Sequence, residues 1–296
     1  MGLTIRQLEI FEKIAATGSV TRAGEELLLT QSAVSMALSQ LEQQSANPLF
    51  ERSGRRLILN ESGRFLLKHA REILQAVKLV EMQLQGDSDQ LAGELLVGGS
   101  TTIGNYLLPA LLGAFARQYP RTRVQLRVGN TRQVAEWLEA GDLDIAFVEG
   151  PCHGRGSVAV PWRDDELVVV VGSEHPWGVA GNATPEMLAS APWIMREKGS
   201  GTREIFEDAM EEAGIGYSIA LEFGHTEAIK NGVASGLGVS CLSRVAVNRE
   251  LEHGLLVEVG SPLKLGRSLS LLKRRDGICT ALMGAFLKMA GGNLVS

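Results

Sequence analysis

Two runs of hydroxyl-bearing residues stand where the chain could bind a small anion. The first is Ser100-Thr101-Thr102 and the second is Gly199-Ser200-Gly201-Thr202. Each run precedes a segment with helical periodicity, so its hydroxyl groups would lie beside the free N–H groups of a helix start. The alternative for each run is that it only caps a helix. The second run is not a nucleotide-binding loop, because no Lys follows it and the longer glycine spacing is absent.

Other polar residues at the ends of neighbouring elements are weaker candidates for the same site: Asn130, Glu149 and Thr226. A carboxylate at Glu149 would repel an anion unless it pairs with an arginine or points away. Arg196 and Arg203 would add positive charge, unless both are ordinary surface residues. Because no aromatic box accompanies these residues, a small inorganic anion or a short carboxylate is the expected ligand. An amino- or amide-bearing metabolite is the alternative.

The residues expected of an enzyme or a metal site do not occur at the required spacing. The five histidines show no HExxH pattern, and no GxSxG nucleophile motif is present. The three cysteines, Cys152, Cys241 and Cys279, form no CxxC pair, so neither a zinc site nor a disulfide framework is indicated. They are expected to be free, buried thiols in a reducing compartment. We therefore expect no catalytic activity, no metal and no cofactor.

A second candidate site is a helix predicted for residues 30–42. Its apolar residues recur at helical spacing and form one stripe: Val34, Ala37, Leu38 and Leu41. The opposite side is small, uncharged and rich in hydrogen-bonding groups, after an N-cap threonine: Thr30, Gln31, Ser32, Ser35 and Ser39. Gln can pair with the major-groove edge of adenine, and Ser can bond to bases or phosphates. The alternative is an amphipathic helix with a serine-rich exposed face.

The segments around this helix favour the DNA-reading interpretation. Helices are expected at residues 4–16 and 20–27, followed by a tight turn into the 30–42 helix, which is the helix-turn-helix plan. A basic β-hairpin is expected at 47–59, with Arg52, Arg55 and Arg56 clustered at its tip, suited to gripping phosphates. The overall net charge of −5 does not exclude DNA binding, because the local charge distribution matters more.

A long helix is predicted from Glu61 to about Gln85. Its apolar residues alternate steps of four and three, as in a coiled-coil seam: Leu66, Ala70, Ile73, Val77, Val80 and Leu84. Such a seam favours pairing with a second helix, here the helix of another chain. The alternative is that the seam packs onto its own domain.

The remaining sequence alternates between expected strands and helices. The first set comprises residues 94–98, 104–118, 123–128, 131–140 and 143–148. The second set comprises residues 167–171, 193–195, 203–213, 219–223, 226–234, 239–241, 255–259, 268–273 and 276–289. This rhythm predicts βαβ units and a largely parallel sheet. Ligands in such folds bind beyond the carboxyl ends of the strands, where the two hydroxyl-bearing runs fall.

Several motifs in order and at the right spacing resemble the LysR-type transcriptional regulators. They are Leu8-Glu9-Ile10-Phe11, Gly18-Ser19-Val20-Thr21-Arg22-Ala23-Gly24, Thr30-Gln31-Ser32-Ala33-Val34-Ser35, Leu41-Glu42, Pro48-Leu49-Phe50-Glu51-Arg52 and Asn60-Glu61-Ser62-Gly63. The resemblance implies a winged helix-turn-helix domain, a linker helix that pairs two chains, and an effector domain of two α/β lobes of the periplasmic-binding-protein type. In the family, residues at both hydroxyl-bearing runs line the effector cleft, and some members respond to oxyanions.

We therefore expect an α+β protein with three parts: a DNA-binding domain at 1–60, a dimerisation helix at 61–89 and an effector domain at 93–296. Lobe 1 would hold residues 93–162 and 267–296, and lobe 2 residues 163–266, with crossovers near Pro161-Trp162 and Leu265-Gly266. The expected partners are double-stranded DNA, a small-molecule effector and further copies of the chain, as a dimer or tetramer. No signal peptide or membrane span is apparent, so a cytoplasmic regulator is expected. The alternative is a solute-binding module without a regulatory role.

Overall fold

A computed structural model describes residues 2–45, 47–54, 56–84, 91–150, 156–275, 277 and 279–291. The chain divides into two compact units. One comprises Met1–Leu91 with the short segments Ala140–Asp142 and Gly277–Ala281, and the other holds the remaining residues. No helix in the described part of the chain is both long and apolar enough to cross a membrane.

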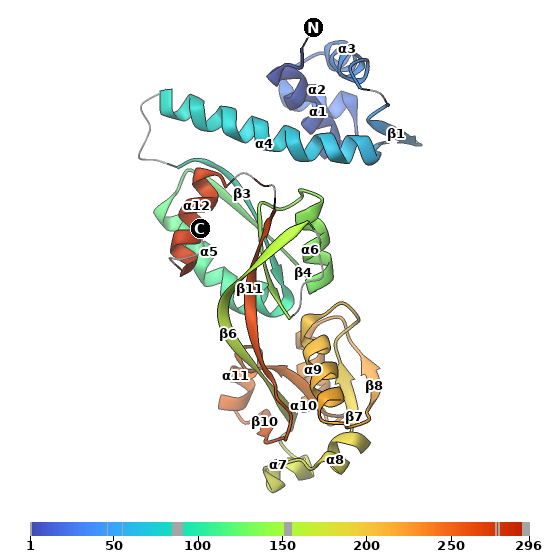
Figure 1. Ribbon diagram of the computed structural model, residues 1–296, viewed down its shortest axis with the longest axis vertical. Helices are drawn as coiled ribbons and strands as arrows, with labels where there is room; N and C mark the ends of the chain where they lie inside the picture. The colour runs from blue at the N-terminus through green and yellow to red at the C-terminus, as the bar shows by residue number, and fades with distance from the viewer. Residues whose placement is uncertain are drawn as a thin grey trace. The chain divides into compact units, whose positions relative to one another are not determined.

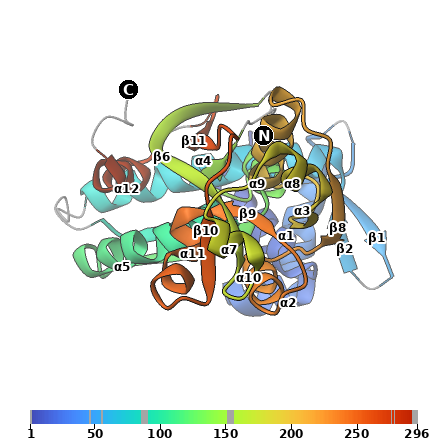
Figure 2. The same ribbon diagram turned by 90° about the horizontal axis from the view of Figure 1, so that it is seen from below.

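The first unit contains four helices and a hairpin: α1 (Ile5–Thr17), α2 (Val20–Leu27), α3 (Gln31–Glu42), β1 (Phe50–Ser53), β2 (Arg56–Leu59) and α4 (Glu61–Leu84). The three short helices begin where hydroxyl caps predict, because the Thr4, Ser19 and Thr30 side chains each accept a backbone N–H of the first turn. The two strands pair antiparallel, and Figures 1 and 2 show this hairpin projecting from the helices. The expected helix-turn-helix and wing are therefore present.

The core of this unit explains why only part of α4 is exposed. Phe11, Val34 and Ala70 are all 0% exposed and belong to one apolar cluster. Leu66 and Leu74 of α4 are partly buried and pack against this cluster. The N-terminal part of the seam predicted on α4 thus packs within its own unit. Farther along, Ile73 and Val80 are exposed, at 39% and 55%. Packing within its own unit therefore accounts for the N-terminal part of the seam, and pairing with another chain stays a prediction for the exposed part.

The second unit begins with a βαβαβ segment. Its elements are β3 (Gly93–Ser100), a π-helical turn η1 (Ile103–Leu107), α5 (Leu108–Gln118), β4 (Thr122–Gly129), α6 (Thr131–Glu139) and β5 (Ile145–Glu149). Strand β3 lies between β4 and β5 and is parallel to both. Helices α5 and α12 (Ala281–Gly291) meet through the rings of Phe115 and Phe286. Helix α6 packs Val134 and Leu138 against a separate cluster that includes β5 residues.

The other lobe contains shorter elements. They are α7 (Pro176–Ala180), α8 (Pro185–Ser190), β7 (Pro192–Met195), α9 (Gly201–Glu212), β8 (Ser218–Glu222), α10 (Thr226–Ala234), β9 (Ser240–Ser243), α11 (Arg244–Glu252) and β10 (Leu256–Val259). Two long strands, β6 (Ser157–Gly172) and β11 (Gly266–Arg274), run side by side through the unit (Figure 1). They join a seven-stranded sheet in the order β10-β6-β11-β5-β3-β4, with β9 also on β6.

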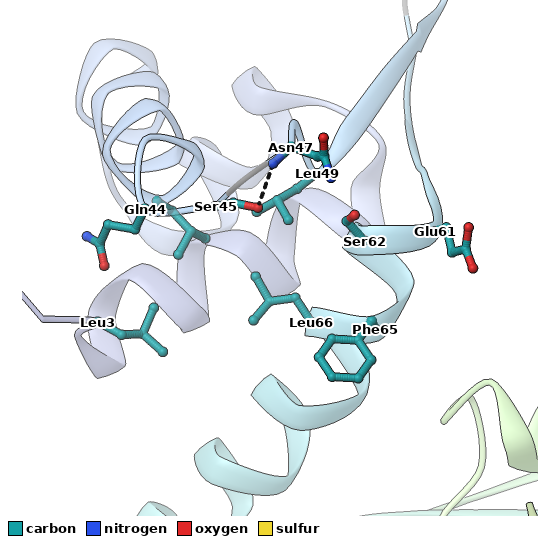
Figure 3. Close-up of a pocket in the computed structure, with 10 residues that line it drawn as sticks. Leu3, Gln44, Ser45, Asn47, Leu49, Glu61, Ser62, Phe65 and Leu66 are labelled. Atoms are coloured by element: carbon teal, nitrogen blue, oxygen red, sulfur yellow. Dashed lines mark hydrogen bonds between the residues drawn. The ribbon is translucent and has the colours of Figure 1, made fainter.

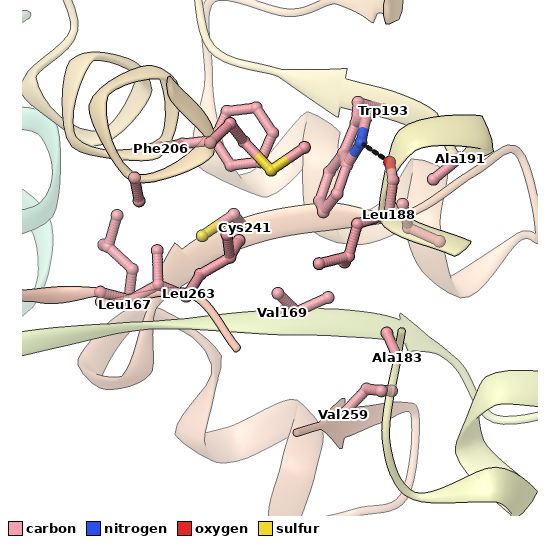
Figure 4. Close-up of a cluster of buried hydrophobic side chains, with 14 of the residues drawn as sticks. Leu167, Val169, Ala183, Leu188, Ala191, Trp193, Phe206, Cys241, Val259 and Leu263 are labelled. Atoms are coloured by element: carbon pink, nitrogen blue, oxygen red, sulfur yellow. Dashed lines mark hydrogen bonds between the residues drawn. The ribbon is translucent and has the colours of Figure 1, made fainter. Parts of the chain in front are cut away.

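Strand β6 builds the core of the second lobe because its side chains alternate between two faces. Leu167, Val169 and Val171 face a cluster with α9 and Trp193. Val168 and Val170 face the opposite cluster, which includes residues of α10 and α11. Figure 4 shows the first cluster, in which the Trp193 indole donates to the Leu188 carbonyl at 2.9 Å.

The structure corrects several expectations. The sheet is not largely parallel. Strand β11 pairs antiparallel with both β5 and β6, and β6 also pairs antiparallel with β9 and β10. The strand expected at 167–171 is the end of the much longer β6, which passes through Pro161 at a bulge in its pairing. Helices α7, α8 and α11 were not expected. Cys279 is exposed rather than buried, Cys241 is buried as expected, and Cys152 lies outside the described residues.

Candidate functional site

The polar face predicted on α3 is free of the unit's core. Gln31, Ser32, Ser35 and Ser39 are all exposed, whereas Val34 and Leu41 are buried. Thr30 accepts the Ala33 N–H at 3.2 Å, and its hydroxyl lies 3.0 Å from that of Ser32. The start of α3 therefore presents hydroxyl and amide groups with no charged side chain among them.

The hairpin expected as the wing supplies positive charge in the same unit. Arg52 and Arg56 are exposed on β1 and β2, next to the turn at Gly54, which has a φ of +60°. Arg55, the third arginine predicted at the tip, lies outside the described residues. Neither Arg52 nor Arg56 forms an ion pair with another residue of the described part of this unit, so both exposed guanidinium groups are suited to contact phosphates.

A groove in the same unit lies between the N-terminus of α1, the end of α3 and the start of α4 (Figure 3). It has a volume of about 630 Å³. Its apolar wall includes Leu3, Leu66 and Phe65, and Phe65 is 68% exposed. The sequence did not predict this groove, because its residues come from three separate segments.

In the second unit, the run Ser100-Thr101-Thr102 lies where β3 ends and the π-helical turn begins. All three residues are buried. The Thr101 hydroxyl donates to the Gly129 carbonyl at 3.1 Å, and the Thr102 side chain makes no capping bond. The Ser100 hydroxyl is fully buried and has no hydrogen-bond partner. Capping alone does not account for this run.

The run Gly199-Ser200-Gly201-Thr202 lies at the start of α9. Ser200 occupies the N-cap position but makes no side-chain capping bond, and its buried hydroxyl is also without a partner. The Thr202 hydroxyl instead accepts from Arg267 at 3.1 Å. The two orphaned serine hydroxyls are exceptions to the rule that buried polar atoms are hydrogen-bonded.

Arg196 joins the two lobes at this site. Its guanidinium, in a side chain only 2% exposed, donates to Thr101 of the first lobe at 3.0 Å and to Thr226 of the second at 3.4 Å. It also binds both oxygens of Glu197, at 2.8 Å each. Burial opposes the charge of Glu197, but Arg196 outweighs it and lowers the pKa of this carboxyl. Arg196 is therefore not a surface residue, and neither is Arg203, which is 8% exposed.

Glu149 pairs with an arginine. The sequence left two ways to avoid repulsion between this carboxylate and an anion, an arginine partner or a side chain that points away, and the structure has the first. Its partner is Arg267 on β11, at 3.1 Å, and both side chains are 1% exposed. Arg267 also binds Asp165 on β6 at 2.7 Å, and the Ser243 hydroxyl donates to Asp165 at 2.9 Å. One buried arginine thus holds two buried carboxylates and the Thr202 hydroxyl together.

Further contacts close the lobes on each other. Asn130 donates to Glu197 at 3.1 Å, and the Gly201 N–H donates to the Thr131 hydroxyl at 3.3 Å. The backbones touch here, because a Cβ added at Gly201 would collide with the Glu149 carbonyl. Of the eight residues predicted for the effector site, five take part in the contacts that join the lobes: Thr101, Asn130, Glu149, Thr202 and Thr226. Ser100, Thr102 and Ser200 are adjacent in the chain to residues that do. Among them, only the Ser100 and Ser200 hydroxyls are known to be buried and unpartnered.

Sequence reasoning missed Arg267 and Asp165. Arg267 lies at the start of β11, and Asp165 lies in the polar first half of β6, so only the tertiary fold brings the two residues to the site. Among the described residues, no group of three or more His, Cys, Asp or Glu side chains is arranged to hold a metal ion.

Comparison with known proteins gives a consistent result for both units. Residues 5–64 match the model of the bacterial regulatory helix-turn-helix protein, lysR family, and residues 88–294 match that of the LysR substrate binding domain. The uncharacterized HTH-type transcriptional regulator YeiE of Escherichia coli K12 is 41% identical over 288 residues, 97% of each chain.

Two solved structures show the same similarity. A full-length single-residue variant of OxyR from Pseudomonas aeruginosa is 25% identical, with a TM-score of 0.78 over 99% of this chain and 95% of that one. The Synechocystis PCC6803 CcmR regulatory domain in complex with 2-PG is 29% identical, with a TM-score of 0.63 over 67% of this chain and 95% of that one. The chain is therefore a member of the LysR family of transcriptional regulators, with an N-terminal helix-turn-helix domain and a C-terminal effector-binding domain.

Proposed function

We propose that the chain regulates transcription by binding double-stranded DNA through α3 and the wing, in response to a small anion held between the two lobes of the effector domain. It acts by binding alone, without a catalytic step, in the cytoplasm where its DNA target lies. The proposed parts are a DNA-binding domain at 1–60, a dimerisation helix at 61–89 and an effector domain at 93–296.

The observation that carries the effector site is the pair of orphaned hydroxyls. A buried hydroxyl without a partner costs roughly 1–3 kcal/mol, so two at the interface between the lobes call for an explanation. A ligand that accepts hydrogen bonds from Ser100 and Ser200 supplies it. Ser200 occupies the N-cap position of α9, and the positive end of a helix dipole favours negative charge. The related CcmR domain bound to 2-PG supports a small ligand in this domain.

The charge balance favours a ligand of low charge. Arg196 and Arg267 are the two buried guanidinium groups of the interface, and three carboxylates face them: Glu149, Asp165 and Glu197. The positive charge is thus already compensated. An anion would be held by hydroxyl and backbone N–H groups more than by a free arginine, and this same balance keeps an amino-bearing metabolite as the second candidate.

For DNA, we assign base contacts to Gln31, Ser32, Ser35 and Ser39, near the N-cap Thr30. Phosphate contacts are assigned to Arg52, Arg55 and Arg56. The exposed, uncharged start of α3 is suited to the major groove, and the wing arginines are suited to the backbone beside it.

For assembly, we propose that two copies pair through α4. Phe65, Ile73 and Val80 are exposed apolar residues at intervals of eight and seven on this helix, so they share one face. The groove beside Phe65 extends that face. A dimer would present two reading helices to the two halves of a symmetric DNA site.

Thermal unfolding of the full chain with sulfate, phosphate, short carboxylates and short amines tests the effector site. We compare the wild type with Ser200→Ala, and use Ser190→Ala as the control. The Ser190 hydroxyl donates to the Glu186 carbonyl in the same lobe, away from the interface. An anion should raise the melting temperature of the wild type and of Ser190→Ala, and Ser200→Ala should reduce this shift.

Without ligand, Ser200→Ala should be as stable as the wild type or slightly more stable, because it removes an unsatisfied buried group. A shift with amines alone would move the assignment to the amino-bearing ligand. Equal anion shifts in wild type and Ser200→Ala would show that Ser200 does not contact the ligand.

A further inference from the structure

Tyr106, Glu227 and Lys230 form a polar cluster at the interface between the lobes. None of the three belongs to the proposed ligand site. Tyr106, in the π-helical turn of the first lobe, donates its hydroxyl to Glu227 near the start of α10 in the second lobe. Lys230, one turn further along α10, binds the same carboxylate oxygen at 2.8 Å. Its ammonium also lies 5.5 Å from the centre of the Tyr106 ring.

Lys230 is fixed from the other side by α11. It donates to Glu250 at 2.9 Å and to the Ala246 carbonyl at 3.2 Å, and its side chain is 6% exposed. Burial opposes the charge of Lys230, but Glu227 and Glu250 raise its pKa. Burial and the bond to Glu227 raise the pKa of Tyr106 to about 12, so the phenol keeps the proton that it donates. Glu227, whose side chain is 63% exposed, is therefore bound by a lysine that is itself buried and bound to α11.

Both partners of the Tyr106–Glu227 bond adjoin the proposed ligand site. Tyr106 lies four residues after Thr102, within a π-helical turn, a geometry that is frequent at functional sites. Glu227 directly follows Thr226, which accepts from Arg196. A movement that separates Tyr106 from Glu227 would shift the segment that runs on from Ser100 at the end of β3 relative to the start of α10, which carries Thr226.

We propose that Tyr106 and Glu227 form a latch that holds the two lobes closed over the buried hydroxyls and so controls access to the ligand site. This inference rests on the proposed effector site, because the latch guards it. Tyr106 is a positioning residue: it touches no ligand, and it acts through Glu227. Other contacts between the lobes, such as that of Arg196 with Thr101, determine how the lobes fit together when closed. The latch increases the fraction of molecules in which they are closed.

Hydrogen exchange of the full chain without any ligand tests the latch. In Tyr106→Phe, the backbone amides near Ser100 and Thr226 should exchange roughly three- to ten-fold faster than in the wild type, about the effect of losing one partly exposed hydrogen bond. The melting temperature should fall by only about 1–5 °C, because the bond lost on opening is also lost on unfolding while the ring and its packing remain. A merely structural role would instead accelerate exchange of amides throughout the unit.

Tyr119→Phe is the matched control, because it removes a phenol hydroxyl from the first lobe at the end of α5, where its partner is the adjacent Gln118. It should exchange as the wild type does. Glu227→Ala should accelerate the same amides, and adding Tyr106→Phe to it should have no further effect. Unchanged exchange in Tyr106→Phe, or additive effects in the double variant, would overturn the latch.

A second arm separates failure of the latch from failure of the ligand site. Sulfate or phosphate added to the wild type should slow exchange of the Ser100 amide and of the amides at the start of α9. If that protection appears while Tyr106→Phe behaves as the wild type, the ligand site stands and the latch is wrong. If neither ion gives protection but Tyr106→Phe opens the lobes, the latch stands and the anion assignment fails.

Discussion

Replacing Arg267 by Met should destabilise the effector-binding unit more than any other single change at the interface between its lobes. The guanidinium donates to Asp165 at 2.8 Å, to Thr202 at 3.1 Å and to Glu149 at 3.1 Å. The side chains of Arg267, Glu149 and Asp165 are each at most 2% exposed. Met fills a similar volume and removes the charge. Two buried carboxylates would then remain with no cation between them.

The magnitude follows from that imbalance. Removing one partner of a buried ion pair costs about 3–5 kcal/mol, because the remaining charge stays buried. Arg267 compensates two carboxylates, so we expect the upper part of that range. In a unit of about 200 residues, the upper part of this range corresponds to a fall of roughly 8–20 °C in melting temperature.

Denaturant unfolding followed by tryptophan fluorescence measures this loss selectively. All four tryptophans, Trp137, Trp162, Trp177 and Trp193, belong to the second unit. Arg163→Met is the control: Arg163 is exposed on β6, where it lies over the Trp162 ring, and its loss should cost no more than about 1 kcal/mol. A loss in Arg267→Met no larger than in Arg163→Met would refute the role given to this ion-pair cluster.

The other predictions concern the first unit. Gln31→Ala should lower discrimination at one base position by ~1–3 kcal/mol, whereas Arg52→Ala should weaken binding to all sequences and flatten its salt dependence; uniform losses in both variants would show that the reading face is misassigned. Ile73→Asp places a charge in the proposed seam at a cost of several kcal/mol, so sedimentation should show smaller species, and an unchanged mass would mean that the seam is not between chains. Leu28→Gly should stabilise the unit by roughly 1 kcal/mol in thermal unfolding, because Leu28 has a φ of +56° that only glycine adopts freely, and its side chain is 93% exposed; a loss of stability would mean that the leucine has a packing role.

Local signals predicted the first unit well. The caps at Thr4, Ser19 and Thr30 mark the helix starts, and the Ser53-Gly54 turn marks the hairpin. These features depend on neighbouring residues, so the sequence displays them directly. The βαβαβ start of the second unit was equally readable, because each apolar run ends at a turn or a helix start.

The long β6 strand was missed for a physical reason. Its first half is mixed and polar and includes Pro161, which removes a backbone donor, so it looks like a loop in isolation. Pairing with β11 supplies its hydrogen bonds. The signals for α8 were present, since Thr184 caps it and Pro185 opens it, but the helix is only six residues long.

The sequence indicated the strand ends and helix starts at which the candidate residues lie. It did not indicate which of their hydroxyl groups are already hydrogen-bonded within the protein. The pattern of strand ends and helix starts indicated Ser100 and Ser200, and the hydroxyls of both are buried without a partner. That the two contact one ligand stays a prediction. The sequence could not distinguish them from Thr101 and Thr202, whose hydroxyls are already bonded within the protein. That difference depends on Arg196 and Arg267, which come from distant segments.

The most direct test of the account is whether occupancy of the lobe interface changes DNA binding. Duplexes selected from a random library by the full chain serve as the target, with affinity measured at fixed ionic strength, with and without the anion that stabilises the wild type. A coupling of ~1–3 kcal/mol predicts a change of about 5- to 150-fold in affinity. Ser100→Ala and Ser200→Ala should each lose most of that change while binding the duplex normally without the anion. An anion effect of the same size in both variants and the wild type would contradict the account.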